Sequence, residues 1–151
     1  MIKNKSIYVF TILSLLILLV LSLSWGIVSK LQLDKSSRQI SLETSLATFS
    51  EFNAQALVQH SHESLLAQMT PQMLGRYIQS LRRLGELVSL DSLSGTTTIA
   101  LLPFNSQDKT ASYKLTTQFS HAEAVIDIQL IYQQGRWQFT RYSVNSSLSA
   151  E

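Results

Sequence analysis

The stretch Ile7–Val28 reads IYVFTILSLLILLVLSLSWGIV and contains no charged residue, no proline and a single glycine. At a rise of 1.5 Å per residue, a helix of this length reaches about 33 Å, which matches a hydrocarbon core of about 30 Å. Hydroxyl side chains inside the run can bond a carbonyl one turn back, so they cost little in lipid. The run predicts one membrane-spanning helix, followed by a separate folded domain.

Residues suited to the two membrane–water interfaces flank this run. Aromatic rings near the ends of a span favour the interface, and lysines favour the headgroup region beyond it. The predicted interface anchors are Lys3, Lys5, Tyr8, Trp25 and Lys30.

A cleaved signal peptide is the competing interpretation of the same segment. Ser22-Leu23-Ser24 has the small-x-small pattern of a cleavage site, and Lys3 and Lys5 would be the basic region before it. The apolar run continues past Ser24 and exceeds the usual length of the apolar region of a signal peptide, which favours an uncleaved signal-anchor. Its short N-terminal tail predicts a cytoplasmic N-terminus and a periplasmic or extracellular domain.

Charge and composition exclude several classes of function. Two of the 12 Lys and Arg residues, Lys3 and Lys5, precede the apolar run, and the other ten balance the 10 Asp and Glu residues that follow. Without a basic stripe, nucleic acid is not an expected partner. The chain has no cysteine, which excludes disulfides, thiolate metal sites, a cysteine nucleophile and a lipid-bearing cysteine.

The pattern divides the chain into four segments. They are a tail with the signal-anchor helix (1–29), a juxtamembrane linker that could continue the helix (30–40), a folded domain (41–146) and a tail (147–151).

Helical periodicity dominates the first half of the predicted domain. Apolar residues at steps of three and four predict a helix over 41–59, with Leu42, Leu46, Phe49, Phe52, Ala56 and Leu57 on its buried face. A short helix is predicted over 63–69. Thr70 as N-cap, Pro71 at the first helical position and Gly85 beyond the last turn predict a third helix.

Alternating apolar residues predict strands in the second half. The expected strands cover 87–93, 96–103, 112–119, 121–132 and 137–144. Gln133–Arg136 is typical of a hairpin turn, and a bulge near Thr140–Arg141 would bring the last strand into phase. Helices followed by strands predict an α+β domain, with about three helices on a curved antiparallel meander of four to five strands.

The chain resembles a known superfamily in this order of elements and in a few motifs. They are Leu84-Gly85-Glu86-Leu87 after the third helix and a last hairpin with Ile126–Tyr132, Gly135-Arg136-Trp137-Gln138-Phe139 and Tyr142-Ser143-Val144. The pattern is similar to the nuclear transport factor 2-like superfamily of cone-shaped α+β domains, especially its small membrane-anchored bacterial members. That fold hosts enzymes, ligand binders and scaffolds, so the resemblance implies a fold and no particular activity.

Candidate sites are few. Tyr113, Phe119, Trp137 and Phe139 are candidates to line an apolar ligand pocket, although core packing explains them equally well. Asp127 beside a tyrosine could form an isomerase-like pair, but alternation directs it away from the apolar face and favours a cross-strand partner for Lys or Arg. His60 and His62 would not converge on one metal ion if they share a helix.

These patterns predict no catalytic residue, no metal site and no cofactor. The expected function is a non-enzymatic subunit or assembly factor of a membrane complex, with the bilayer and another envelope protein as partners. A module that binds a small apolar ligand is the alternative, and an isomerase-like enzyme is the third hypothesis.

Overall fold

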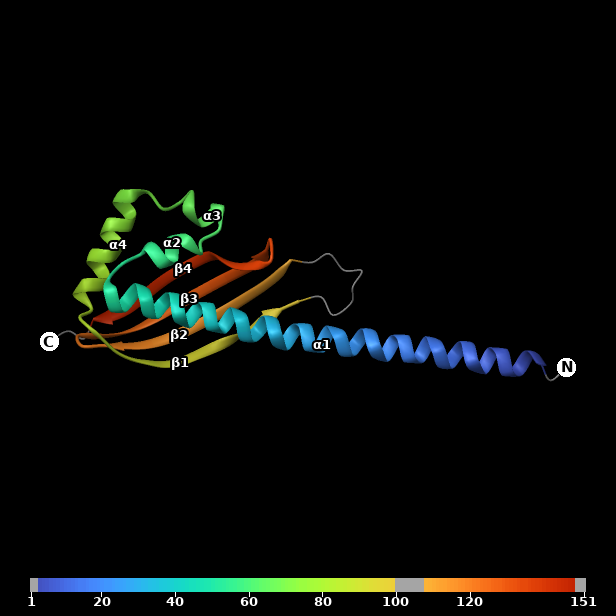
Figure 1. Cartoon of the computed structure of the whole chain (residues 1–151). Helices are drawn as coiled ribbons and strands as arrows, with labels where there is room; N and C mark the ends of the chain where they lie inside the picture. Colours follow the sequence, from blue (N-terminus) through green and yellow to red (C-terminus); the bar gives the residue numbers. More distant parts are fainter. Residues whose placement is uncertain (1–2, 100–107, 149–151) are drawn as a thin grey trace.

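A single long helix runs through the molecule. The computed structural model describes residues 3–99 and 108–148, and α1 occupies Lys3–Glu51 as one helix of 49 residues. At 1.5 Å per residue it is about 74 Å long. Its N-terminal half projects away from the domain, and its C-terminal half lies along the sheet (Figure 1). Within the described residues, α1 is the one helix long and apolar enough to cross a membrane.

The projecting half of α1 has an apolar surface that no other part of the described chain covers. Large apolar side chains from Tyr8 to Val28 are between 43% and 78% exposed. The hydroxyls of Ser14, Ser22 and Ser24 donate to carbonyls three or four residues earlier, at 2.8 to 3.0 Å. The expected hydroxyl bonding within the run is therefore confirmed.

Residues 30–40 continue the same helix without interruption. Ser37 is fully buried in this segment, and Leu33 and Ile40 pack against the domain core. Of the two predicted forms of this segment, linker or helical continuation, the structure has the continuation. The domain is therefore joined to the apolar segment by an ordered helix whose inner side is already packed.

Three short helices follow α1. The predicted helix over 41–59 is split, because Phe52 adopts a left-handed φ of 47° after Glu51, and α2 starts only at Gln55–Gln59. This turn brings Leu57 back into the core, where it is fully buried. α3 is one turn, Glu63–Leu66, and α4 is Pro71–Arg83.

The predicted ends of α4 are confirmed. Thr70 Oγ1 accepts a hydrogen bond from the Met73 amide at 3.2 Å, and Pro71 begins the helix. Gly85 follows the last turn with a φ of 86°, and a Cβ there would collide with the side chains of Ser120 and His121. Only glycine meets both demands at this position.

The sheet is an antiparallel meander with the strand order β1-β2-β3-β4. Its strands are β1 Leu87–Thr98, β2 Lys109–Phe119, β3 Ala122–Gln133 and β4 Arg136–Leu148. The α+β class is confirmed, with four strands.

Several of the expected strand boundaries differ in the structure. The strands predicted over 87–93 and 96–103 are one strand, because pairing with β2 continues through Gly95, which lies opposite Tyr113. The end of the second of them, 100–103, lies outside the described residues. β4 continues past its predicted end at Val144 to Leu148, which pairs with Ala122.

The last hairpin has the predicted turn and bulge. Gln134 and Gly135 take positive φ values of 53° and 78°, as a two-residue hairpin turn requires. Gln129 pairs with Arg141 while its neighbour Leu130 pairs with Phe139, which leaves Thr140 as the extra residue. The bulge turns Phe139 and Tyr142 to the same buried side of the sheet.

The core lies between the helices and one face of the sheet. Phe49 of α1 is fully buried and packs edge-on against Phe119, with ring centroids 5.4 Å apart. The predicted buried face of α1 is wrong in part, because Leu46 is 49% exposed. Small hydroxyl residues face the sheet instead, at steps of three and four. This hydroxyl row comprises Ser37, Ser41, Thr44, Ser45 and Thr48, each at most 3% exposed.

Candidate functional site

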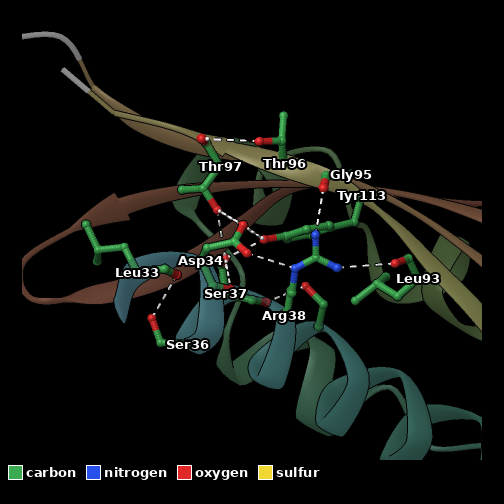
Figure 2. Close-up of polar contacts among 11 residues, drawn as sticks. Leu33, Asp34, Ser36, Ser37, Arg38, Leu93, Gly95, Thr96, Thr97 and Tyr113 are labelled. Carbon is green, nitrogen blue, oxygen red and sulfur yellow. Dashed lines mark hydrogen bonds and ion pairs between the residues drawn. The ribbon is translucent and has the colours of Figure 1, made fainter. Parts of the chain in front are cut away.

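A polar cluster fixes α1 to the sheet just beyond the apolar segment. Asp34 Oδ1 accepts hydrogen bonds from Thr97 Oγ1 at 2.8 Å and from the Tyr113 hydroxyl at 3.1 Å. Asp34 Oδ2 accepts from Arg38 Nε at 2.9 Å. Ser37 Oγ lies 2.6 Å from the Tyr113 hydroxyl. Figure 2 shows these groups converging from α1, β1 and β2, and we call them the Asp34 cluster.

Arg38 extends the cluster to the backbone of β1. Its Nη2 donates to the Gly95 carbonyl at 2.8 Å and its Nη1 to the Leu93 carbonyl at 3.3 Å. The guanidinium also lies 5.2 Å from the centre of the Tyr113 ring. Gly95 is required here, because its φ is 144° and a Cβ would collide with the Ser112 carbonyl. One arginine therefore bonds a helical carboxylate and two strand carbonyls.

The contacts of the cluster determine the charge state of its carboxylate. Burial by itself would raise the pKa of Asp34, but the hydrogen bonds from Thr97, Arg38 and Tyr113 and the positive charge of Arg38 outweigh it and lower the pKa from 3.8. Burial raises the pKa of the Tyr113 hydroxyl, which stays a neutral donor. The Asp34 carboxylate is therefore ionised at neutral pH and accepts from three donors, Thr97, Tyr113 and Arg38.

Replacing Asp34 by alanine is expected to lower the free energy of unfolding by about 1–3 kcal/mol, because Arg38, Thr97 and Tyr113 lose an acceptor. The folded-state pKa lies below the unfolded value of 3.8, so this stabilisation is complete above that pH and disappears as the pH falls through the folded pKa. Thermal unfolding of the full chain in detergent, followed from pH 7 down to pH 2, measures both effects.

Glu43→Ala is the matched control, because Glu43 is exposed on the same helix and bonds only Gln39 among the described residues. An Asp34→Ala protein as stable as the parent at pH 7 would contradict the assigned role of the cluster.

Further contacts hold the rest of α1 against the sheet. The Ser45 hydroxyl lies 2.7 Å from the Tyr142 hydroxyl, and Trp137 Nε1 donates to Ser36 Oγ at 3.0 Å. Burial raises the pKa of Tyr142, so it too stays neutral. The helix is thus bonded to the first, second and last strands of the sheet.

The four predicted pocket residues all belong to the core. Phe119 and Phe139 are at most 1% exposed, which leaves no surface for a ligand. Tyr113 contributes its hydroxyl to the Asp34 cluster. Trp137 is 4% exposed, packs edge-on against Tyr132 and lines an open pocket at the end of the domain nearest the apolar helix. The structure therefore does not gather these four side chains around one cavity.

The predicted interface anchors lie on α1. Tyr8 and Trp25 are 67% and 78% exposed, and Lys30 is exposed one turn beyond Trp25. The side chains of Lys3 and Lys5 lie outside the described set.

The histidines and Asp127 have local structural partners. His62 accepts from the Ser64 amide as the N-cap of α3, and His60 Nδ1 lies 2.9 Å from the Ala56 carbonyl. Asp127 accepts from Asn145 at 3.0 Å and pairs across the strands with Lys114 at 3.9 Å, as predicted. Among the described residues, no three His, Asp or Glu side chains converge as a metal site would require.

A groove opens at the far end of the domain, opposite the apolar helix. The turn after α1, α2 and α4 enclose about 640 Å³, lined by Phe52, Ala54, Val58, Leu74 and Ile78, with Asn53, Gln55, Gln79 and Arg82 as polar groups. Gly75 also lines it, and no heavy atom lies within 4 Å of the position that a Cβ would take there. We call this the distal groove. α4 forms the outermost layer at this end of the molecule (Figure 1).

Sequence reasoning missed the Asp34 cluster. One signal was present, because Asp34 and Arg38 are four residues apart, a spacing that pairs opposite charges on a helix. Comparisons with protein-family models, with curated proteins and with solved structures return no match to this chain.

Proposed function

We propose that this chain is a single-span membrane protein whose α+β domain is held at a fixed position above the bilayer and binds another envelope protein without catalysing a reaction. The observation that carries the proposal is the continuity of α1. The same helix is bare and apolar in its first half and bonded into the sheet in its second half. Such a helix couples the position of the domain directly to the membrane.

The exposure of the apolar half supports membrane insertion. Apolar surface in water costs about 25 cal/mol per Å², and this half of α1 has no protein cover in the described chain. A bilayer removes that cost. The uninterrupted helix through Ser24 also supports an uncleaved anchor, because cleavage there would divide α1 into two parts.

The proposed orientation has the N-terminus in the cytoplasm and the domain on the periplasmic or extracellular side. This orientation leaves Lys3 and Lys5, which precede the apolar run, on the cytoplasmic side, where flanking lysines are common. A C-terminal fusion to a reporter enzyme that is active only outside the cytoplasm is expected to be active. A fusion active only in the cytoplasm would contradict this orientation.

The chemistry of the buried groups supports a binding role over catalysis. Within the described residues, the buried polar side chains are those of Ser, Thr and Gln, together with tyrosine hydroxyls. None of these titrates near neutral pH without a strong perturbing group, and burial raises the pKa of Tyr142 further from neutrality. An isomerase-like mechanism requires a buried acid or base at neutral pH.

The distal groove is the proposed docking site, and its chemistry indicates the kind of segment that fits. Its apolar walls suit an amphipathic helix or an extended apolar peptide. Arg82 lines it, and Arg76 and Arg83 are exposed nearby on α4. A partner segment with apolar residues next to an acidic one would satisfy both features. We also propose that the domain has the nuclear transport factor 2-like fold, and the order of helices before a four-stranded meander supports this. The proposed fold implies no particular activity.

Filling the groove is expected to abolish docking without unfolding the domain. In Gly75→Phe, the new side chain meets open space, and replacing a mid-helix glycine stabilises α4 by several tenths of a kcal/mol. A photo-cross-linking amino acid at Gln79 is expected to capture one reproducible membrane or envelope protein in intact cells. The Gly75→Phe change is expected to reduce the yield at least tenfold.

Gln72→Phe is the control, because Gln72 is exposed on the same helix and does not line the groove. Equal yields from the two phenylalanine variants would contradict docking in the groove. Failure to capture any reproducible partner would contradict the interaction role.

A further inference from the structure

A second pocket lies at the opposite end of the domain, beside the point where α1 leaves the apolar segment. It encloses about 520 Å³ between α1 and the β3–β4 hairpin. Its lining includes Ser29 and Ser36 of α1 together with Lys109, Tyr132, Arg136 and Trp137 of the sheet. We call it the membrane-proximal pocket. Ser29 directly follows Val28, the last residue of the apolar run.

The position of this pocket relative to a bilayer follows from the helix rise. If the apolar run fills the hydrocarbon core, Ser29 lies at its boundary and Ser36 about 10 Å further out. The headgroup layer on each side of a bilayer is about 5–8 Å thick. The end of the pocket at Ser29 therefore lies at the level of the lipid headgroups, on the side where the domain sits, and the end at Ser36 lies just beyond them.

The side chains around the opening have the chemistry of a headgroup site. Lys109 Nζ lies 5.3 Å from the centre of the Tyr132 ring and has no acidic partner among the described residues. Arg136 lies at the β3–β4 hairpin. With the Gln138 amide oriented so that its oxygen faces Arg136, this oxygen accepts hydrogen bonds from Arg136 Nε at 2.8 Å and Nη2 at 3.0 Å. Both cations are exposed, and aromatic rings beside them favour the interface.

The surrounding charge is also cationic. Lys30 and Lys35 are exposed on the adjacent helix. The acids nearby are Asp34, whose charge is paired with Arg38, and Asp108, which precedes Lys109 in the chain. Positive charge therefore predominates at this end, although the domain as a whole is neutral.

We propose that the membrane-proximal pocket binds the phosphate headgroup of an anionic phospholipid through Lys109 and Arg136. Tyr132 and Trp137 form the aromatic wall of the pocket beside the headgroup. This inference rests on the membrane span of the proposed function. The bound lipid would fix the tilt of the domain against the membrane surface, which a single span leaves free.

The test uses the full chain in nanodiscs that contain phosphatidylcholine and phosphatidylglycerol, with retained lipid counted by native mass spectrometry after release. The parent protein is expected to retain phosphatidylglycerol. The double variant Lys109→Gln/Arg136→Gln is expected to bind it about thirtyfold more weakly, equivalent to about 2 kcal/mol for two cations near a membrane surface. Both side chains are exposed, so the thermal midpoint of the variant is expected to stay within about 2 °C of the parent.

Arg76→Gln/Arg83→Gln removes the same charge from exposed positions at the far end of the domain and is expected to retain the lipid. Equal retention by the two double variants would overturn the proposal. Displacement of the lipid by an equal concentration of inorganic phosphate would show a free-anion site and would also overturn it. A chain that does not enter nanodiscs would contradict the span itself, whereas a chain that enters and retains no anionic lipid overturns only the headgroup site.

Discussion

Replacing Phe49 by alanine is expected to lower the free energy of unfolding by about 3–5 kcal/mol, the largest effect of any single change considered for this chain. Phe49 is fully buried where α1 meets the sheet, edge-on to Phe119 and 6.5 Å from the Tyr142 ring centre. Its removal leaves a cavity between α1 and two strands. A domain with a total stability of about 5–15 kcal/mol loses a large share of it.

Thermal unfolding of the full chain in detergent measures the effect of Phe49→Ala, with an expected fall in midpoint of at least about 10 °C. Leu46→Ala is the control on the same helix, because Leu46 is 49% exposed and its loss is expected to cost less than about 1 kcal/mol. Equal losses from the two variants would mean that α1 does not face the sheet through Phe49.

Replacing Ser41 by leucine is expected to destabilise the domain by about 1–3 kcal/mol through overpacking. Ser41 is fully buried in the middle of the hydroxyl row, where α1 lies close to the sheet. Its hydroxyl donates to the Ser37 carbonyl of the same helix at 2.7 Å and so contributes no bond to the sheet. What matters at this position is therefore the small volume of the side chain, which fits between α1 and the sheet.

Ser41→Ala separates size from polarity. Alanine keeps the small volume and favours the helix, so the midpoint is expected to stay within about 2 °C of the parent. If the leucine variant is as stable as the alanine variant, α1 and the sheet are not closely packed at this position.

The hydroxyl row also shows where hydropathy misleads. The sequence pattern assigned Leu46 to the buried face of α1, because apolar side chains normally pack in the core, but Leu46 is 49% exposed. The close approach of α1 instead favours serine and threonine, whose hydroxyls bond the helix itself or a tyrosine, as Ser45 bonds Tyr142. That distance of approach is a tertiary property, so no local periodicity encodes it.

Other parts of the fold were predictable because their signals are local. The cap at Thr70, the positive φ at Gly85, the turn at Gln134–Gly135 and the bulge at Thr140 each depend on a few neighbouring residues. The four-stranded meander follows from the alternation of β2 and β3 and from that turn. The continuity of β1 through Gly95 was missed, because a glycine often interrupts a strand, and its pairing with Tyr113 depends on the folded sheet.

The sites required contacts between distant parts of the sequence. Asp34 and Arg38 signalled a helical ion pair, but Thr97 and Tyr113 join them only after the sheet has folded. The same holds for the membrane-proximal pocket, where Lys109 and Arg136 come from different strands. The apolar run and its flanks were the most informative segment of the sequence, and the structure adds that the helix does not stop where the apolar run stops.

The central claim is that one rigid helix connects the bilayer to the domain. Double electron–electron resonance spectroscopy, which measures the distance between two spin labels, tests it most directly. The chain has no cysteine, so spin labels at Leu16→Cys and Gln39→Cys are the only two in the molecule. In nanodiscs, a continuous helix predicts a narrow distance distribution centred at about 35 Å, from a rise of 1.5 Å per residue. A broad distribution with a shorter mean would contradict the account, because it would show a flexible connection between Leu16 and Gln39.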